Sequence, residues 1–154
     1  GWFIRWQGAA LSWGSRKQKC IALSTCEAEI IALSEAAKDV VYLRKLVTGL
    51  GHAPESATVL RTDSKAARDV SYNPEQHEKM KHVERRHFFV RDMVEDFQIS
   101  VPHVSTHDNA ADFFTKPMYN AAKFFAFRAV IMGEARPAYP PPRAPPALAA
   151  PGAE

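Results

Sequence analysis

Three acidic side chains stand where predicted secondary-structure elements begin or end. Glu29 lies early in a predicted helix, Asp63 follows a predicted strand, and Asp112 lies in the first turn of a later helix. Carboxylates gathered from separate elements repel one another unless a cation neutralises them, and hard divalent cations such as Mg²⁺ prefer oxygen ligands. If the three converge, they can support metal-assisted hydrolysis of a phosphodiester, with ions holding the attacking water and the leaving oxygen.

Each of these carboxylates also has a purely structural explanation. Acidic residues in the first turn of a helix complement its dipole, which would account for Glu27, Glu29 and Asp112. Asp63 could cap the helix that follows it. Spacing alone therefore leaves both explanations open.

The strongest helix signal in the sequence begins with a capping box, with Ser24 at the N-cap and Glu27 at the third helical position. Apolar residues then recur at steps of three and four as far as Val47, which gives the helix one apolar face. Because Glu27 already has a capping role, Glu29 is the better candidate ligand in this helix.

The rest of the chain alternates short strands with helices. The order strand, strand, helix, strand, helices, strand, helix predicts an α/β fold with a mixed sheet, opened by a hairpin. Pro117 is expected to break or bend the last helix. The predicted strands are residues 2–6, 10–13, 57–62 and 99–104, and the predicted helices begin after Ser24, at Ser64, near Glu78 and at Ala110.

Composition separates a globular region from an atypical C-terminal segment. Hydrophobic residues make up 46% of the chain and charged residues 24%, close to globular averages. Seven of the 11 prolines lie between Pro137 and Pro151, in a stretch where no apolar periodicity can develop. We therefore expect a domain over residues 1–118, a helical extension over 119–132 and a disordered Pro/Ala-rich tail over 133–154.

The charge and the apolar pattern exclude some classes of protein. A net charge of +3 permits a nucleic-acid partner. No apolar run approaches the roughly 18 residues that a membrane span needs, and no signal peptide opens the chain. The two cysteines are too few for a disulfide framework. We expect no membrane partner and no small-molecule cofactor.

Basic residues gather in two segments, the loop 14–19 and the predicted helix that starts near Glu78. They could contact the phosphates of a nucleic acid, or they could be solvated charged faces. Three histidines in the second segment recur every five residues, so they fan around a helix and do not converge on one metal. The candidates for phosphate contacts are Arg16, Lys17, Lys19, Lys79, Lys81, Arg85 and Arg86.

Several local motifs together resemble the ribonuclease H domain of copia-type LTR retrotransposon Pol polyproteins. They occur in the order and with the approximate spacing of that family, and the resemblance covers Gly1 to about Met118. No single motif is decisive, but the set is specific. The motifs are residues 9–19, 22–33, 62–64 (Thr-Asp-Ser), 77–83, 86–91 and 109–117 (Asn-Ala-Ala-Asp-Phe-Phe-Thr-Lys-Pro).

The resemblance implies a site of four acidic residues, two Mg²⁺ (or Mn²⁺) ions, and an RNA strand paired with DNA as the substrate. Asp63 matches the aspartate of the Thr-Asp-Ser motif, and Asp112 matches the aspartate that precedes Thr-Lys-Pro. The family places its glutamate directly before an apolar run ending in Ala-Leu, which selects Glu29 over Glu27. These three residues are the implied catalytic metal ligands.

Further roles follow from the same resemblance. His107 resembles the loop histidine that helps product or metal release in this superfamily, with His103 as the runner-up and a solvated loop histidine as the alternative. The resemblance also implies that the reverse transcriptase domain of the parent polyprotein is a partner. The expected location is the cytoplasm, in the virus-like particle of the parent element.

The first aspartate of the family would lie upstream of Gly1, on a central strand between the hairpin and the strand 57–62. We therefore expect a ribonuclease H-like mixed sheet with flanking helices and with this first strand missing. Either the sheet shows a gap, or the strand 2–6 moves over to pair with 57–62. Two functions remain open: an active ribonuclease H, or a truncated, inactive remnant with weak nucleic-acid binding.

Overall fold

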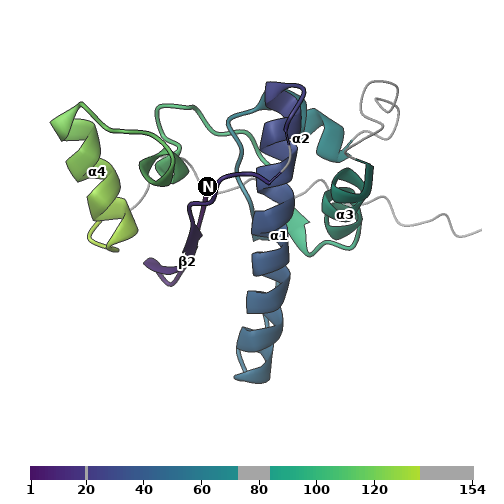
Figure 1. Cartoon of the computed structure of the whole chain (residues 1–154). Coiled ribbons are helices and arrows are strands. Elements are labelled where there is room, and N and C mark those ends of the chain that lie inside the picture. Colours follow the sequence, from purple (N-terminus) through teal and green to yellow (C-terminus); the bar gives the residue numbers. More distant parts are fainter. Residues whose placement is uncertain (20, 73–83, 136–154) are drawn as a thin grey trace, which may run out of the picture.

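A long helix, α1 (Thr25–Gly49), runs through the middle of the molecule (Figure 1). The hydroxyl of Ser24 accepts a hydrogen bond from the backbone N–H of Glu27, at 3.1 Å. The Glu27 carboxylate in turn accepts from the backbone N–H of Leu23, at 2.7 Å. The predicted capping box is therefore confirmed, with Leu23 as the reciprocal donor. The residues that the computed structural model describes are 1–19, 21–72 and 84–135.

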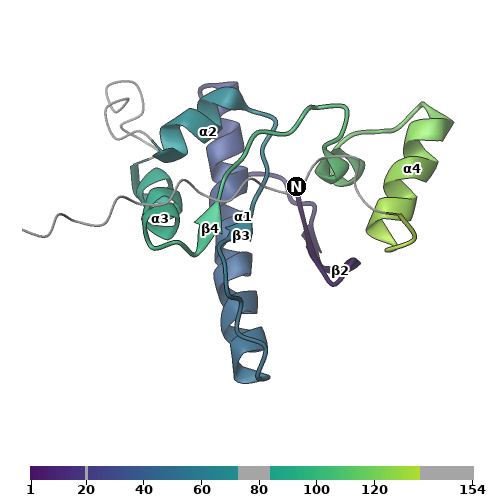
Figure 2. The same ribbon diagram turned by 180° about the vertical axis from the view of Figure 1, so that it is seen from behind.

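Helix α1 separates two groups of elements, and both pack against its buried face. Helices α2 (Lys65–Tyr72) and α3 (Glu84–Glu95) lie on one side, and the N-terminal hairpin lies on the other (Figures 1 and 2). Ile30 and Val40 of α1 are almost fully buried in this core. The periodicity that predicted one apolar face of α1 is thus explained by packing on both flanks.

The N-terminal hairpin consists of β1 (Trp2–Trp6) and β2 (Ala9–Gly14), paired antiparallel as predicted. Gln7 and Gly8 form its turn, and both have positive φ, 52° and 91°. Such a turn matches the right-handed twist of the two strands. The carboxylate of Asp39 in α1 accepts hydrogen bonds from the Trp2 indole and the Ser12 hydroxyl, which fixes the hairpin to the helix.

A second, separate sheet consists of β3 (Thr58–Val59) and β4 (Ile99–Ser100), paired in parallel. Both strands are shorter than predicted, although their backbones stay side by side to an isolated bridge between Thr62 and His103. The expected single mixed sheet is wrong for the described residues, which form two two-stranded sheets. What the structure does show is a mixed α/β architecture.

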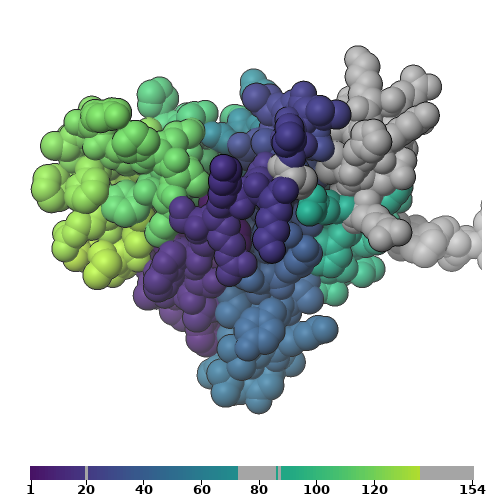
Figure 3. All heavy atoms as spheres, viewed as in Figure 1, coloured from purple at the N-terminus to yellow at the C-terminus, as the bar shows by residue number. Residues whose placement is uncertain are grey.

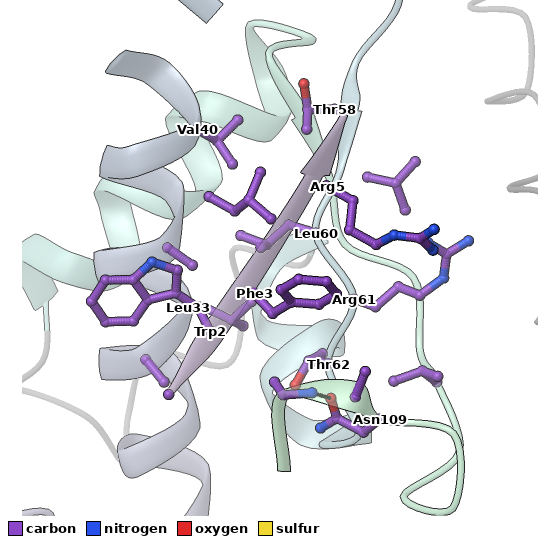
Figure 4. A pocket seen from close by; sticks show the side chains of 18 of the residues that line it. Trp2, Phe3, Arg5, Leu33, Val40, Thr58, Leu60, Arg61, Thr62 and Asn109 are labelled. Atoms are coloured by element: carbon purple, nitrogen blue, oxygen red, sulfur yellow. Dashed lines mark hydrogen bonds between the residues drawn. The ribbon is translucent and has the colours of Figure 1, made fainter. Parts of the chain in front are cut away.

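A cavity of about 350 Å³ separates the two sheets. Figure 4 shows that β1 and the segment Thr58–Thr62 line it together, with Leu33 and Val40 of α1 on another wall. The strand 2–6 therefore does not move over to pair with 57–62. Of the two expected outcomes, the gap is the one observed.

The C-terminal part of the described chain contains a short 3₁₀ helix, η2 (Ala110–Phe114), and helix α4 (Ala121–Ile131). We predicted a longer helix from Ala110, but Pro117 disfavours helical geometry in the residue before it, and the 3₁₀ helix ends after five residues. Figure 3 shows the first residues of the chain between this C-terminal region and α1.

Helix α4 ends at a left-handed glycine, Gly133, whose φ is 78°. The backbone N–H groups of Glu134 and Ala135 donate back to the carbonyl of Ala129. Residues 133–135, which we assigned to the tail, therefore close this helix. The rest of the predicted tail, 136–154, lies outside the described residues.

The second basic segment is described only in part. Helix α3 covers the C-terminal portion of the helix predicted from about Glu78. Lys79 and Lys81 lie outside the described residues, as does the side chain of Arg85. In the described ranges, no helix combines the length and the apolar character that crossing a membrane requires.

Candidate metal and catalytic site

The three predicted carboxylates come from three separate elements. Glu29 lies in the first turns of α1, Asp63 follows the buried Thr62 at the carboxyl end of the β3 segment, and Asp112 lies in η2. Electrostatic interactions connect all three, because Asp63 and Asp112 both raise the pKa of Glu29. The fold thus brings three residues that are far apart in the sequence into one neighbourhood.

The Glu29 carboxyl group is disfavoured in its charged form. Burial is the largest cause of its raised pKa, and the negative charge of Asp63 is the next. The terminal ammonium of Gly1 and the side chain of Lys116 act in the opposite direction. The contributions of Asp63 and Asp112 to this shift show that negative charges lie near Glu29, where a cation would be stabilised.

Asp63 does not cap the helix that follows it. The hydroxyl of Ser64 accepts a hydrogen bond from the backbone N–H of Ala67, at 3.1 Å, and so takes the capping position of α2. The backbone N–H of Ser64 donates to the hydroxyl of the buried Thr62. The capping explanation, which the sequence left open for Asp63, is therefore not needed.

The Asp112 carboxylate is buried, and it is held by a lysine that the sequence did not single out. The Lys116 ammonium donates to both Asp112 carboxylate oxygens, each at 3.0 Å. The Asp112 side chain is 9% exposed and that of Lys116 is 57% exposed. The hydrogen bond to Asp112 is the largest cause that raises the Lys116 pKa, and the charges of Asp63 and Glu29 add to it.

The spacing of Asp112 and Lys116 could have revealed this pair. An i, i+4 pair of opposite charge is close in helical geometry, and the backbone N–H of Lys116 also donates to the Asp112 carbonyl. The position falls within the Thr-Lys-Pro motif. In the sequence, that motif locates Asp112, and its lysine has no predicted role.

The donor set suits a hard cation, although the side chains do not already form a closed metal site. Within residues 1–19, 21–72 and 84–135, no three His, Cys, Asp or Glu side chains are close enough together to hold one ion. Carboxylate oxygens are nevertheless the ligands that Mg²⁺ and Mn²⁺ prefer. The observed arrangement is a cluster of negative charge with Lys116 as its counterion.

Glu27 is placed differently from Glu29, although both lie in the first turns of α1. Its side chain is buried and is engaged by the N–H of Leu23. This hydrogen bond supports the choice between the two glutamates that the capping box suggested.

The two candidate histidines, His103 and His107, both lie in the segment that precedes η2. His107 is exposed in the loop before η2, where its backbone N–H donates to the Ser105 hydroxyl. His103 is exposed as well, and its backbone bridges to Thr62. A role for His107 in product or metal release stays a prediction.

The basic loop between the hairpin and α1 lies next to the acidic cluster. The Gln18 amide donates to the carbonyl of Ala28, and the Ser15 hydroxyl donates to the carbonyl of Phe114. These bonds join the loop both to the start of α1 and to η2. Arg16, Lys17 and Lys19 are exposed on it, and the Arg16 guanidinium lies 5.7 Å from the centre of the Trp2 ring.

Proteins similar to this chain are Pol polyproteins of plant transposons. It is 41% identical over 117 residues to the retrovirus-related Pol polyprotein from transposon TNT 1-94 of Nicotiana tabacum, covering 75% of this chain and 9% of that protein. The corresponding polyproteins from transposons RE2 and RE1 of Arabidopsis thaliana are each 35% identical over 112 residues, covering 73% of this chain and 8% of each relative.

These homologues support an origin in a retrotransposon Pol polyprotein. The chain spans less than a tenth of the length of these relatives, so it corresponds to one portion of a much larger protein. No family model and no solved structure matches this chain.

Proposed function

We propose that the chain is the ribonuclease H module of a retrotransposon Pol polyprotein and hydrolyses the RNA strand of RNA–DNA hybrids during reverse transcription. The observation that carries the proposal is the acidic cluster of Glu29, Asp63 and Asp112, drawn from three elements of a chain whose homologues are Pol polyproteins. A hybrid substrate and a neighbouring reverse transcriptase domain follow from the same resemblance.

Mg²⁺ or Mn²⁺ is the cofactor that this donor set would hold. When bound, such ions activate water and stabilise the attacking and leaving oxygens of a phosphodiester. The backbone bridge between Thr62 and His103 positions the neighbouring Asp63, and the 3₁₀ helix η2 positions Asp112. Burial and the negative charge of Asp63 raise the pKa of Glu29 and so disfavour its charged form. A nearby cation would favour that charged form.

The exposed basic loop supplies the contact for the substrate backbone in this proposal. Arg16, Lys17 and Lys19 stand beside the acidic cluster because the loop is bonded to both α1 and η2. Each phosphate contact that such residues make should release counterions and lower the affinity at high salt. The role of the second basic segment, including Arg86 in α3, stays a prediction.

The experiment that tests this function compares Glu29 with its capping neighbour. Cleavage of a hybrid with labelled RNA is measured in Mg²⁺, using this chain and a fusion that adds the segment preceding the matching region of the transposon TNT 1-94 polyprotein. In the active form, Glu29→Gln should lower the cleavage rate by at least about 100-fold. Glu27→Gln should keep most of the activity, because Glu27 serves the helix cap.

A second candidate function is hybrid binding without cleavage. The observation that favours it is the lysine held by both oxygens of Asp112, because a carboxylate paired in this way is already neutralised. Under this alternative, fluorescence anisotropy detects hybrid binding, while neither the chain nor the fusion cuts RNA in Mg²⁺. Cleavage by either form that depends on Glu29 excludes it.

A further inference from the structure

We propose that Lys116 is a built-in counterion of the acidic site, which competes with the divalent cation for the carboxylate of Asp112. The inference rests on the proposed function, since it concerns the metal occupancy of the same site. Lys116 would then help to determine the concentration of divalent cation at which the site becomes occupied.

The geometry of the pair carries this proposal. The Lys116 ammonium is 3.0 Å from each carboxylate oxygen of Asp112, so it occupies the open side of that group. A cation that binds both oxygens must approach from the same side. The lysine and the ion therefore exclude each other at Asp112, because two like charges cannot share that position.

The two partners differ in how firmly they are fixed. Asp112 is buried in η2, and the side chain of Asn109, the N-cap of η2, accepts a hydrogen bond from the N–H of Ala111. The Lys116 side chain is 57% exposed and reaches Asp112 from the solvent side. Exposed lysine side chains have many rotamers, so the ammonium can leave without any movement of the carboxylate.

We expect Lys116 to lower the affinity of the site for a divalent cation. Without a cation, Lys116 offsets the repulsion that Asp112 adds to the cluster. With a cation, binding must first break the ion pair. A partly exposed ion pair of this kind changes affinity by about fivefold, which is the effect of its removal that we expect.

The test is a Mn²⁺ titration followed by electron paramagnetic resonance, on the full chain at constant ionic strength. Lys116→Gln should bind Mn²⁺ about fivefold more tightly than the unchanged chain. Lys116→Arg, which keeps a charge able to pair with both oxygens, should bind no more tightly than the unchanged chain. The matched control is Lys123→Gln, which removes the same charge from α4, where Lys123 lies over the Phe127 ring.

The outcomes separate this proposal from the function on which it rests. Equal Mn²⁺ affinity of Lys116→Gln and the unchanged chain overturns the counterion role, as does an equal gain in Lys123→Gln. Either result leaves the ribonuclease proposal intact, because hybrid cleavage is measured separately. Failure of every folded variant to bind Mn²⁺ overturns the counterion role, while the ribonuclease proposal is decided by the cleavage assay of the fusion. If circular dichroism shows that Lys116→Gln does not fold, the Mn²⁺ affinity of Lys116→Arg decides. An affinity higher than that of the unchanged chain overturns the counterion role, and an equal or lower affinity supports it.

Discussion

At the scale of single residues, Glu27 and Glu29 show how two positions in one helix turn take opposite environments. The carboxylate of Glu27 accepts a backbone hydrogen bond at the start of α1. That of Glu29 is half-buried, and its pKa is raised by this burial and by the negative charge of Asp63. The capping box in the sequence predicted the role of Glu27, because it depends only on local spacing, and the choice of Glu29 as a metal ligand stays a prediction.

Replacing Glu29 should stabilise the protein at neutral pH. A carboxyl group with a raised pKa binds more protons in the folded state than in the unfolded state, so stability falls as the pH rises from about 4.3 through the folded pKa. Allowing for solvent screening, we expect Glu29→Gln to raise the free energy of unfolding by about 0.5–1 kcal/mol at pH 7.5. Urea denaturation at pH 7.5 and pH 4 measures the difference.

Glu27→Gln is the control for this prediction. It should lower the free energy of unfolding by about 0.5–1 kcal/mol at pH 7.5, because the charged hydrogen bond at the helix N-terminus is weakened. If both substitutions destabilise the protein equally at pH 7.5, the assignment of opposite environments is wrong.

At the scale of elements, α1 contains a deeply buried hydroxyl, that of Ser34, for which the described residues provide no hydrogen bond. Ser34 is 1% exposed, and its hydroxyl has no hydrogen-bond partner among the residues that the structure describes. Replacing it with alanine removes a buried polar group and favours the helix. We expect Ser34→Ala to raise the free energy of unfolding by about 1 kcal/mol, measured by urea denaturation.

Ser71 in α2 provides the matched comparison for Ser34. It is as deeply buried, but its hydroxyl donates to the carbonyl of Ala67 at 2.8 Å. Ser71→Ala should therefore be neutral or destabilising by up to about 1 kcal/mol. A stabilisation by Ser71→Ala as large as that by Ser34→Ala would contradict the account based on hydrogen bonding.

The sequence predicted these elements well where their signals were local. The cap and apolar face of α1, the hairpin and the start of α2 depend on neighbouring residues, and they were found. The lengths of β3 and β4 depend on pairing with distant strands, so composition overestimated them. The ion pair of Lys116 was missed although its i, i+4 spacing is a local signal, because the Thr-Lys-Pro motif served only to locate Asp112.

At the scale of the whole molecule, the cavity between the two sheets is the main departure from a continuous sheet. The N–H groups of Thr58, Leu60 and Thr62 donate hydrogen bonds to carbonyl groups of the β4 segment, residues 98–102. In a parallel ladder the intervening residue presents its backbone in the opposite direction, so the Val59 N–H faces the gap. The resemblance to ribonuclease H places a strand at this position.

Hydrogen exchange can test whether this edge accepts a strand. In the present chain, the Val59 N–H should exchange much faster than the Leu60 N–H, which donates to the Ser100 carbonyl at 2.8 Å. Fusion of the preceding segment from the transposon TNT 1-94 polyprotein should protect Val59. Protection of Val59 equal to that of Leu60 without the added segment would show that its N–H already has a partner.

Hybrid cleavage by this fusion in Mg²⁺, with and without Asp63→Asn, shows whether the acidic cluster is a ribonuclease site. We expect the RNA strand to be cut and the DNA strand to stay intact. Asp63→Asn should lower the rate by at least about 100-fold, while circular dichroism shows an unchanged fold. A folded fusion that binds the hybrid but leaves the RNA intact, or one that cuts equally well after Asp63→Asn, would contradict this expectation.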